Sequence, residues 1–433
     1  MKQVKHEILD ETFHYEILPS GFKLYILPKR GFCKKHAVLT VDFGSTDRSF
    51  ALPGSGEIVQ IPDGVAHYLE HRMFERPEGD VTDQFTALGV EVNAQTGFTS
   101  TEYFFSCIDG FEKGLELLLD TVLHLHLTPE GVKREREIIA REIQLYSDHL
   151  EWVSFFHILQ TLYREHPLGV DIAGTLESIR QIDSEILEVC YKNFYCPSNM
   201  GLFVSGDVEI EKTRDQVYTW IENQAFDGGH PIQRLPCRDL PNTIEGPRDA
   251  WLPIVQPRLC LGFKDRDAGM QGTRLLRREI ALELALDILF GPSSSFFSMH
   301  YESGLIDSDS FGYEVYAEPV FGFCLLGGDT HQPEYLEELL IAEIRKGQSG
   351  LMIETEFPRV KRKAYGHLLH HLEQVEGCAS MMHSAVSRGA QPFDFFEAYE
   401  ALGPQDVLNC LETWLDPENY GCSFVRPGPG GMN

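Results

Sequence analysis

The sequence predicts a protein of mixed helices and sheets, α+β or α/β, whose chain divides into two related halves. Segments with strand-like alternation interleave with segments of helical periodicity, which indicates layers of both kinds. A turn-rich stretch interrupts the chain near its middle, and short strings before that stretch recur after it. At 433 residues, of which 42% are hydrophobic, the chain is long enough for more than one buried core.

The first half opens with the pattern of a β-hairpin, because residues 15–18 and 22–27 flank the turn formers of 19–21. Further strands are expected at three places: 37–43, 91–107 and 199–206. Helices are predicted at three more: from about Asp63, over 111–125 and over 129–150. Asp63 is a plausible N-cap for the first of these helices.

Turn formers with little periodicity mark residues 227–250 as a linker. The predicted domains are therefore 1–226, which bears the metal motif described below, and 251–433, a homologous domain that lacks it.

The relation between the halves rests on matching strings. Val132–Arg134 and Val360–Arg362 each head a predicted helix, and along that register Glu135 falls opposite Lys363. Glu142 falls opposite His370 in the same way. The second half is expected to keep the architecture without the carboxylates.

A formal charge of −29 argues against a nucleic-acid partner, because a polyanion would be repelled. The excess of acidic residues either keeps the protein soluble or makes an acidic interior that favours basic peptides. Composition alone does not distinguish these two interpretations. We expect no membrane span, because no apolar run approaches about 18 residues. The first seven residues lack the apolar core of a secretory signal, and none of the ten cysteines forms a Cys-x-x-Cys pair, so we expect a cytoplasmic protein.

The segment 63–74 contains a candidate metal site. His67 and His71 are four residues apart, so on a helix both imidazoles project from one face and can bind one ion. Glu70 lies on that face beside the ion, where it can accept a proton from a metal-bound water. Two neutral imidazoles suit Zn²⁺, whose catalytic sites use three protein ligands and one water.

The third ligand is expected on the helix predicted over 129–150, whose segment Lys133–Ile143 offers three glutamates. Glu135 and Glu142 are seven residues apart and share a face, whereas Glu137 points elsewhere. We assign Glu142 as the ligand because its neighbours are Ile139, Ala140 and Ile143. Glu135 is assigned to the catalytic site as a carboxylate that orients a ligand or the water.

With this spacing of His67, Glu70, His71 and Glu142, the chain resembles the pitrilysin/insulinase family of inverted zincins, which includes mitochondrial processing peptidase. Further stretches are similar to that family: Gly64–His71, Val92–Thr96, Glu135–Glu142, His166–Gly169 with Gly174-Thr175, and Pro197–Met200. The resemblance spans the first half, and the second half matches it in layout.

The resemblance implies an α+β fold of two homologous halves, each a mostly antiparallel sheet covered by helices. It implies a short processing-peptidase-like member that assembles as a dimer around a peptide-sized chamber. Asn93, Ala94, Gln95 and Thr96 resemble the edge strand against which an extended peptide substrate lies. The implied activity is zinc-dependent hydrolysis of peptide bonds, with Glu70 as general base.

The sequence departs from that family in its second half. Catalytic members supply an Arg and a Tyr there to hold the substrate carbonyl, but this chain has His300 or Tyr301 in place of the arginine and Asp307 in place of the tyrosine. We therefore expect a homologous partner chain to provide the missing pair. A homodimer is one alternative, and Tyr313 or Arg278 would substitute if the alignment of this stretch is shifted by several residues. The alternative is a non-catalytic subunit that forms the chamber and binds peptides.

Overall fold

The computed structural model describes residues 1–77, 79–223, 232–235, 244 and 246–428. Much of the predicted linker, 227–250, lies outside these residues. The chain forms two compact units. Unit 1 contains Met1–Gln144, Val170–Cys237 and His371–His383, and unit 2 contains Leu145–Gly169, Arg238–His370 and Ser384–Asn433.

The centre of unit 1 is a seven-stranded sheet of order β1-β2-β3-β11-β4-β10-β9. All neighbouring strands are antiparallel except β3 and β11. Along β10 the side chains alternate, so that Tyr103 and Phe105 enter the core while Glu102 and Ser106 face the other way. The strands are β1 (Lys2–His6), β2 (Glu11–Ile17), β3 (Lys23–Pro28), β4 (Lys35–Val41), β9 (Glu91–Thr96), β10 (Thr101–Cys107) and β11 (Met200–Gly206).

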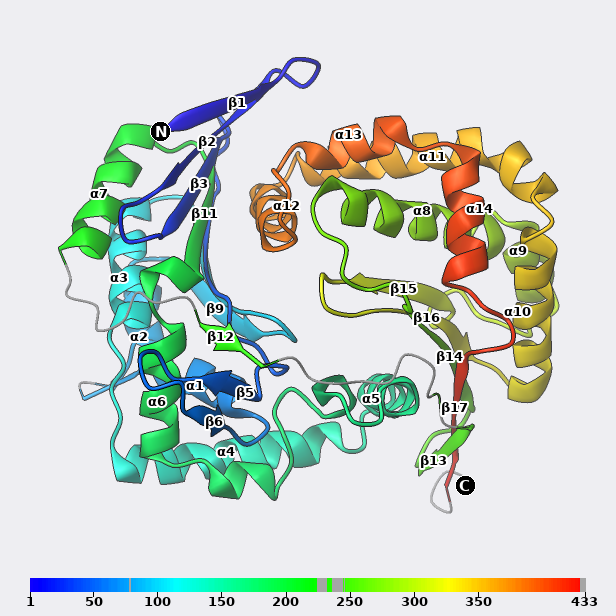
Figure 1. Cartoon of the computed structure of the whole chain (residues 1–433), viewed down its shortest axis with the longest axis horizontal. Coiled ribbons are helices and arrows are strands. Elements are labelled where there is room, and N and C mark those ends of the chain that lie inside the picture. Colours follow the sequence, from blue (N-terminus) through cyan, green and yellow to red (C-terminus); the bar gives the residue numbers. More distant parts are fainter. Residues whose placement is uncertain (78, 224–231, 236–243, 245, 429–433) are drawn as a thin grey trace. The chain divides into compact units, whose positions relative to one another are not determined.

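Helices cover the core face of this sheet, and α3 and α7 lie along it in Figure 1. In α3, Leu115, Leu118, Leu119 and Val122 repeat at helical spacing and are fully buried. The helices of unit 1 are α1 (Val65–Met73), α2 (Thr82–Ala87), α3 (Phe111–Leu123), α4 (Pro129–Tyr146, its end in unit 2), α6 (Ser184–Phe194) and α7 (Ile210–Glu222). Short elements complete it: β5 (Ser49–Ala51), β6 (Ile58–Gln60), β7 (Glu75–Arg76), β8 (Gly79–Asp80), β12 (Gln233–Arg234), and 3-10 turns at Ser178–Gln181 and Pro197–Asn199.

Unit 2 repeats this plan with a five-stranded sheet of order β13-β17-β14-β16-β15. Its one parallel pair, β13 with β17, takes the place of β3 with β11, and the remaining pairs are antiparallel. The expected α+β fold of two similar halves, each with a mostly antiparallel sheet covered by helices, is therefore confirmed. The strands are β13 (Arg248–Leu252), β14 (Arg258–Lys264), β15 (Gly312–Ala317), β16 (Gly322–Asp329) and β17 (Gly421–Pro427).

In unit 2, α8 and α10 pack on one face of the sheet and α5 packs on the strands β13, β14 and β17. Gly262 permits the close approach of α5, because a Cβ there would lie 2.7 Å from the side chain of Ile158. The helices are α5 (Leu150–Leu162), α8 (Thr273–Phe290), α9 (Ser295–Glu302), α10 (Pro333–Gly347), α11 (Leu351–His371), α13 (Asp394–Ala401) and α14 (Pro404–Thr413), with a 3-10 turn at Pro167–Gly169.

The compact units cross the boundary predicted from the sequence. Helix α5 precedes the linker but belongs to unit 2, whereas most of α12 (Val375–Ser387) follows it but belongs to unit 1. The domain limits 1–226 and 251–433 stay a prediction.

Among the described residues, no single helix has the length and apolar character to cross a membrane, although the bent pair α8 and α9 passes that test by length and composition. Helix α8 is buried over most of its surface within unit 2, and a buried core helix has the same composition. The nine cysteines in the described part of the chain are free, and all except Cys33 are buried. The cytoplasmic location stays a prediction.

Candidate metal centre

Helix α1 begins where the backbone makes a turn that suits glycine. Gly64 has φ of 92°, and a Cβ at this position would lie 2.4 Å from the carbonyl oxygen of Ala173. The N-cap is therefore Gly64, and the expectation that Asp63 caps the helix is wrong. Asp63 instead forms an ion pair with Arg48 and accepts a hydrogen bond at its carbonyl from Ser178.

The apolar residues of α1 fix which way its histidines face. Val65, Tyr68, Leu69 and Met73 are fully buried in the core of unit 1. His67, Glu70 and His71 occupy the remaining face, as the sequence predicted. The hydroxyl of Tyr68 donates to the carbonyl of Val132, which ties α1 to the first turn of α4.

Helix α4 brings two glutamates to that face. Val132, Glu135 and Ile139 form its buried stripe, while Glu137 is exposed. Glu142 Oε1 lies 3.7 Å from His67 Nε2, and its Oε2 lies 3.5 Å from His71 Nε2. Glu135 Oε1 lies 2.8 Å from His71 Nδ1. Helices far apart in the sequence thus bring together the residues assigned to the metal and Glu135.

Burial and charge set the protonation of these groups. Burial, with the charge of His71, lowers the pKa of His67 to about 3, so this imidazole is neutral. Burial also disfavours the charged form of His71, but the hydrogen bond and charge of Glu135, together with Glu70 and Glu142, outweigh it and raise its pKa. Burial raises the pKa of Glu142, with the charges of Asp171 and Glu135 adding to it and that of His71 opposing it.

The donor set of His67, His71 and Glu142 fits a zinc ion. The three ligand atoms lie within 4.8 Å of one another, and two ligands of a tetrahedral ion with bonds of about 2.1 Å are roughly 3.4 Å apart. The 3.5 and 3.7 Å separations at Glu142 are close to that value. Among the described residues, His67, His71 and Glu142 form the one group of His, Cys, Asp or Glu side chains close enough together to hold a metal ion.

Glu70, which the sequence predicts to be the base, makes a hydrogen bond to the neighbouring strand β9. Its Oε2 accepts a hydrogen bond of 2.5 Å from Thr96 Oγ1 on β9. Burial raises the pKa of Glu70, and the charge of Glu142 adds to it, whereas the Thr96 hydrogen bond and the charge of His71 lower it. The carboxylate therefore lies beside the metal ligands with its proton affinity increased.

The predicted peptide-binding residues lie on β9, which is an edge strand of the sheet. Asn93 and Ala94 line a pocket of about 740 Å³ together with Glu70 and His71. Gln95 turns away and donates to Glu102 at 2.7 Å, and Thr96 contacts Glu70. The role of these four residues in binding substrate stays a prediction.

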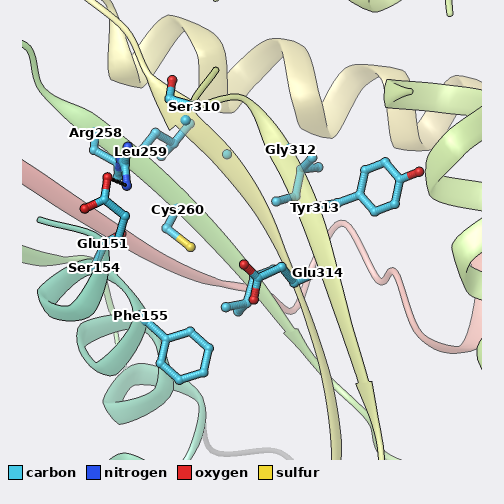
Figure 2. A pocket seen from close by; sticks show the side chains of 14 residues that line it. Glu151, Ser154, Phe155, Arg258, Leu259, Cys260, Ser310, Gly312, Tyr313 and Glu314 are labelled. Atoms are coloured by element: carbon cyan, nitrogen blue, oxygen red, sulfur yellow. Dashed lines mark ion pairs between the residues drawn. The ribbon is translucent and has the colours of Figure 1, made fainter. Parts of the chain in front are cut away.

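Unit 2 also contains a pocket, of about 210 Å³, between α5 and the edge strand β15 (Figure 2). Figure 2 shows Glu151 paired with Arg258 at its rim, with a separation of 3.1 Å. Arg258 also pairs with Asp329 at 2.5 Å, and Cys260 and Glu314 border the floor. The arginine is thus engaged by two carboxylates, and the lining offers no set of metal ligands.

Sequence reasoning missed the residues that support the site. Arg72, directly after His71, is fully buried between Glu75 and Glu135. Thr96 was expected to bind substrate, but its contact with Glu70 was not foreseen. The alternating charges of Arg72, Glu75, Arg134 and Glu135 were visible in the sequence, yet charges on helices are usually solvated, so the pattern does not indicate burial.

Comparison with known proteins agrees with this geometry. The family described as Insulinase (Peptidase family M16) matches residues 55–176, and the one described as Peptidase M16 inactive domain matches residues 181–364. The chain therefore belongs to the M16 peptidase family, the family of the insulinases.

Relatives cover the whole chain. A protein of Bacillus subtilis described as the uncharacterized zinc protease YmfH is 35% identical over 428 residues, 99% of each chain. A crystal structure of an M16-like peptidase from Alicyclobacillus acidocaldarius has a TM-score of 0.92 at 32% identity, and covers 96% of this chain and 99% of that one. The beta subunit of the mitochondrial-processing peptidase of Neurospora crassa is 32% identical over 155 residues, 35% of this chain and 33% of that one.

Proposed function

We propose that this chain is a zinc metalloendopeptidase that hydrolyses bonds in peptides or unfolded segments bound in extended form inside a chamber. The observation that carries the proposal is the convergence of His67, His71 and Glu142 beside Glu70. A scaffold without catalysis has no physical need for three ligands and a base on two separate helices.

In the proposed reaction the residues have separate roles. His67, His71 and Glu142 would hold Zn²⁺, which when bound would supply Lewis-acid polarisation of the scissile carbonyl and of a water. Glu70 removes the proton of the attacking water at its carboxylate and later returns it to the leaving amine. Glu135 accepts a hydrogen bond from the Nδ1–H of His71, which leaves the Nε2 lone pair for the metal.

The proposed substrate is an extended peptide, and the edge strand β9 supports this choice. An edge strand offers unpaired backbone groups, and these bind any extended chain while adjacent pockets select side chains. The pocket of about 740 Å³ beside Glu70 and Asn93 has room for several substrate residues.

We further propose that a homologous partner chain supplies an Arg and a Tyr. The residues at those places in unit 2 are poor substitutes. Asp307 accepts hydrogen bonds from Asp309 and Ser310, and the hydroxyl and backbone groups of Ser310 outweigh burial and lower its pKa, so it has no proton to donate. Burial lowers the pKa of His300, so it is uncharged. This supports the alternative of partner-dependent activity over activity of the isolated chain.

The test is zinc content together with peptide cleavage in the wild type and in His71→Ala. The wild type should bind one zinc per chain and cleave unstructured peptides over long incubation, and a chelator should abolish cleavage. His71→Ala should lose both properties, whereas His124→Ala, which changes an exposed histidine of the same unit, should keep them. Full zinc occupancy in His71→Ala would refute the assignment.

A further inference from the structure

The end of α1 contains a charged side chain that has no access to solvent. The guanidinium of Arg72 is fully buried and donates to Glu75 and to the carbonyl of His126, the latter at 3.4 Å. Room for it exists because residue 131 at the start of α4 is a glycine, where a Cβ would lie 2.8 Å from Arg72 Nη2. Because a buried charge is costly unless it is paired, its partners must account for its presence.

The second carboxylate beside Arg72, that of Glu135, connects it to the predicted metal ligands. Arg72 Nη1 lies 3.7 Å from Glu135 Oε2, while the other oxygen of that carboxylate is 2.8 Å from His71 Nδ1. On its far side, Glu75 also pairs with Arg134. The result is a row of alternating charge, Arg134, Glu75, Arg72 and Glu135, that ends at His71.

We propose that Arg72 is a positioning residue for the metal centre, an inference that rests on the proposed function. By holding one oxygen of Glu135, it directs the other to the Nδ1–H of His71 and so fixes the ring with Nε2 toward Glu142. His67 gains no such support, since its buried Nδ1 has no hydrogen-bond partner among the described residues. Being fully buried, Arg72 cannot touch a peptide, so its effect must pass through Glu135.

Zinc affinity, measured by competition with a chromophoric chelator, tests this without a peptidase assay. Arg72→Met should weaken zinc binding about 10–100-fold, the usual effect of losing a group that orients a metal ligand. Arg72→Lys keeps the countercharge and should lose much less. The matched control is Arg136→Met, which changes a half-buried arginine of α4 that donates to the carbonyl of Ile182. The zinc affinity of this variant should equal that of the wild type.

A double-mutant cycle separates positioning from a general effect on folding. In a Glu135→Gln background, Arg72→Met should change the affinity little, because the carboxylate through which it acts is gone. Equal losses in both backgrounds, or wild-type affinity in Arg72→Met, would overturn the inference. Arg72→Gln, which retains a donor for Glu75, carries the same expectation if Arg72→Met does not fold. Failure of the proposed metal site would appear separately, as wild-type zinc affinity in His71→Ala.

Discussion

The helix pairs α1–α4 in unit 1 and α8–α11 in unit 2 meet through charged contacts of different chemistry. In unit 1, His71 meets Glu135 at 2.8 Å, and in unit 2, Asp287 meets Lys363 at 2.8 and 3.0 Å. Lys363 is the residue that the sequence register places opposite Glu135. The ion pair satisfies both of its members, whereas the histidine contact leaves a second ring nitrogen free to bind a metal.

The matching helix contacts also assign equivalent places to the other site residues. If Asp287 takes the place of His71, then Leu286 takes the place of Glu70 and Glu283 that of His67. On β15, Ala317 takes the place of Thr96, since each pairs with the first residue of the next strand. Unit 2 therefore keeps the strand order and the helix contact but has neither the base nor the histidines. The comparison shows that one architecture can carry or omit a metal site through a few side chains.

The sharpest test of this difference is Glu70→Gln, which gives α1 a neutral side chain at the place where α8 has Leu286. Activity should fall about 10²–10⁴-fold because the base is lost, while zinc content and fold remain. Rates on an unstructured peptide and metal analysis check this. Glu137→Gln, an exposed glutamate on α4, is the control and should behave as wild type. Loss of zinc along with activity would mean that Glu70 has a different role.

The second test concerns what unit 2 lacks for catalysis. With His300 and Asp307 where donors are needed, the zinc-loaded chain alone should be about 10²–10³-fold slower than the ~10 s⁻¹ typical of enzymes. The measurement is turnover of unstructured peptides by the purified chain. A rate near ~10 s⁻¹ without a second protein would contradict the need for a partner.

The third test removes the charged contact of each helix pair in turn. Lys363→Met removes the cation that pairs with the buried Asp287, so the free energy of unfolding should fall by about 1–3 kcal/mol with zinc affinity unchanged. Replacing both partners, as Asp287→Leu with Lys363→Met, should recover most of that loss. Glu135→Gln should instead weaken zinc binding about 10–100-fold. Urea unfolding and zinc titration of all three variants check these expectations. A change in zinc affinity in Lys363→Met as large as that in Glu135→Gln would contradict the comparison.

Much of the fold and the centre of the site follow from local patterns in the sequence. The spacing of His67 and His71 fixes one helix face, and the apolar neighbours of Glu142 distinguished it from Glu135 and Glu137. The first inference needs only the helical period, and the second needs in addition the residues directly beside Glu142. The hairpin of β2 and β3 follows from alternation about a turn in the same way.

Other features depend on contacts that no local pattern encodes. The place of Asp63 was wrong because the nearby carbonyl of Ala173, more than a hundred residues away, leaves room only for glycine before α1. The burial of Arg72 does not follow from its neighbours in the sequence, because it requires Glu75, Glu135 and a glycine at 131 together. The sequence also does not show that α5 belongs to unit 2 and most of α12 to unit 1, because an apolar helix face can pack against either sheet.

The smallest expected effect concerns Thr96, whose counterpart in unit 2 is Ala317. The Thr96 hydroxyl donates to Glu70 and lowers its pKa against the larger effect of burial, which raises it. Thr96→Val removes that donor at nearly constant shape, so the pKa of Glu70 should rise further. A base acts only when ionised, so the acidic limb of the kcat/KM profile should move to higher pH, while activity at high pH is retained. The pH profile of Thr86→Val, an exposed threonine on α2, should match the wild type. An acidic limb that stays in place or moves to lower pH would show that the Thr96 contact does not tune the base, and that this difference between β9 and β15 has no part in catalysis.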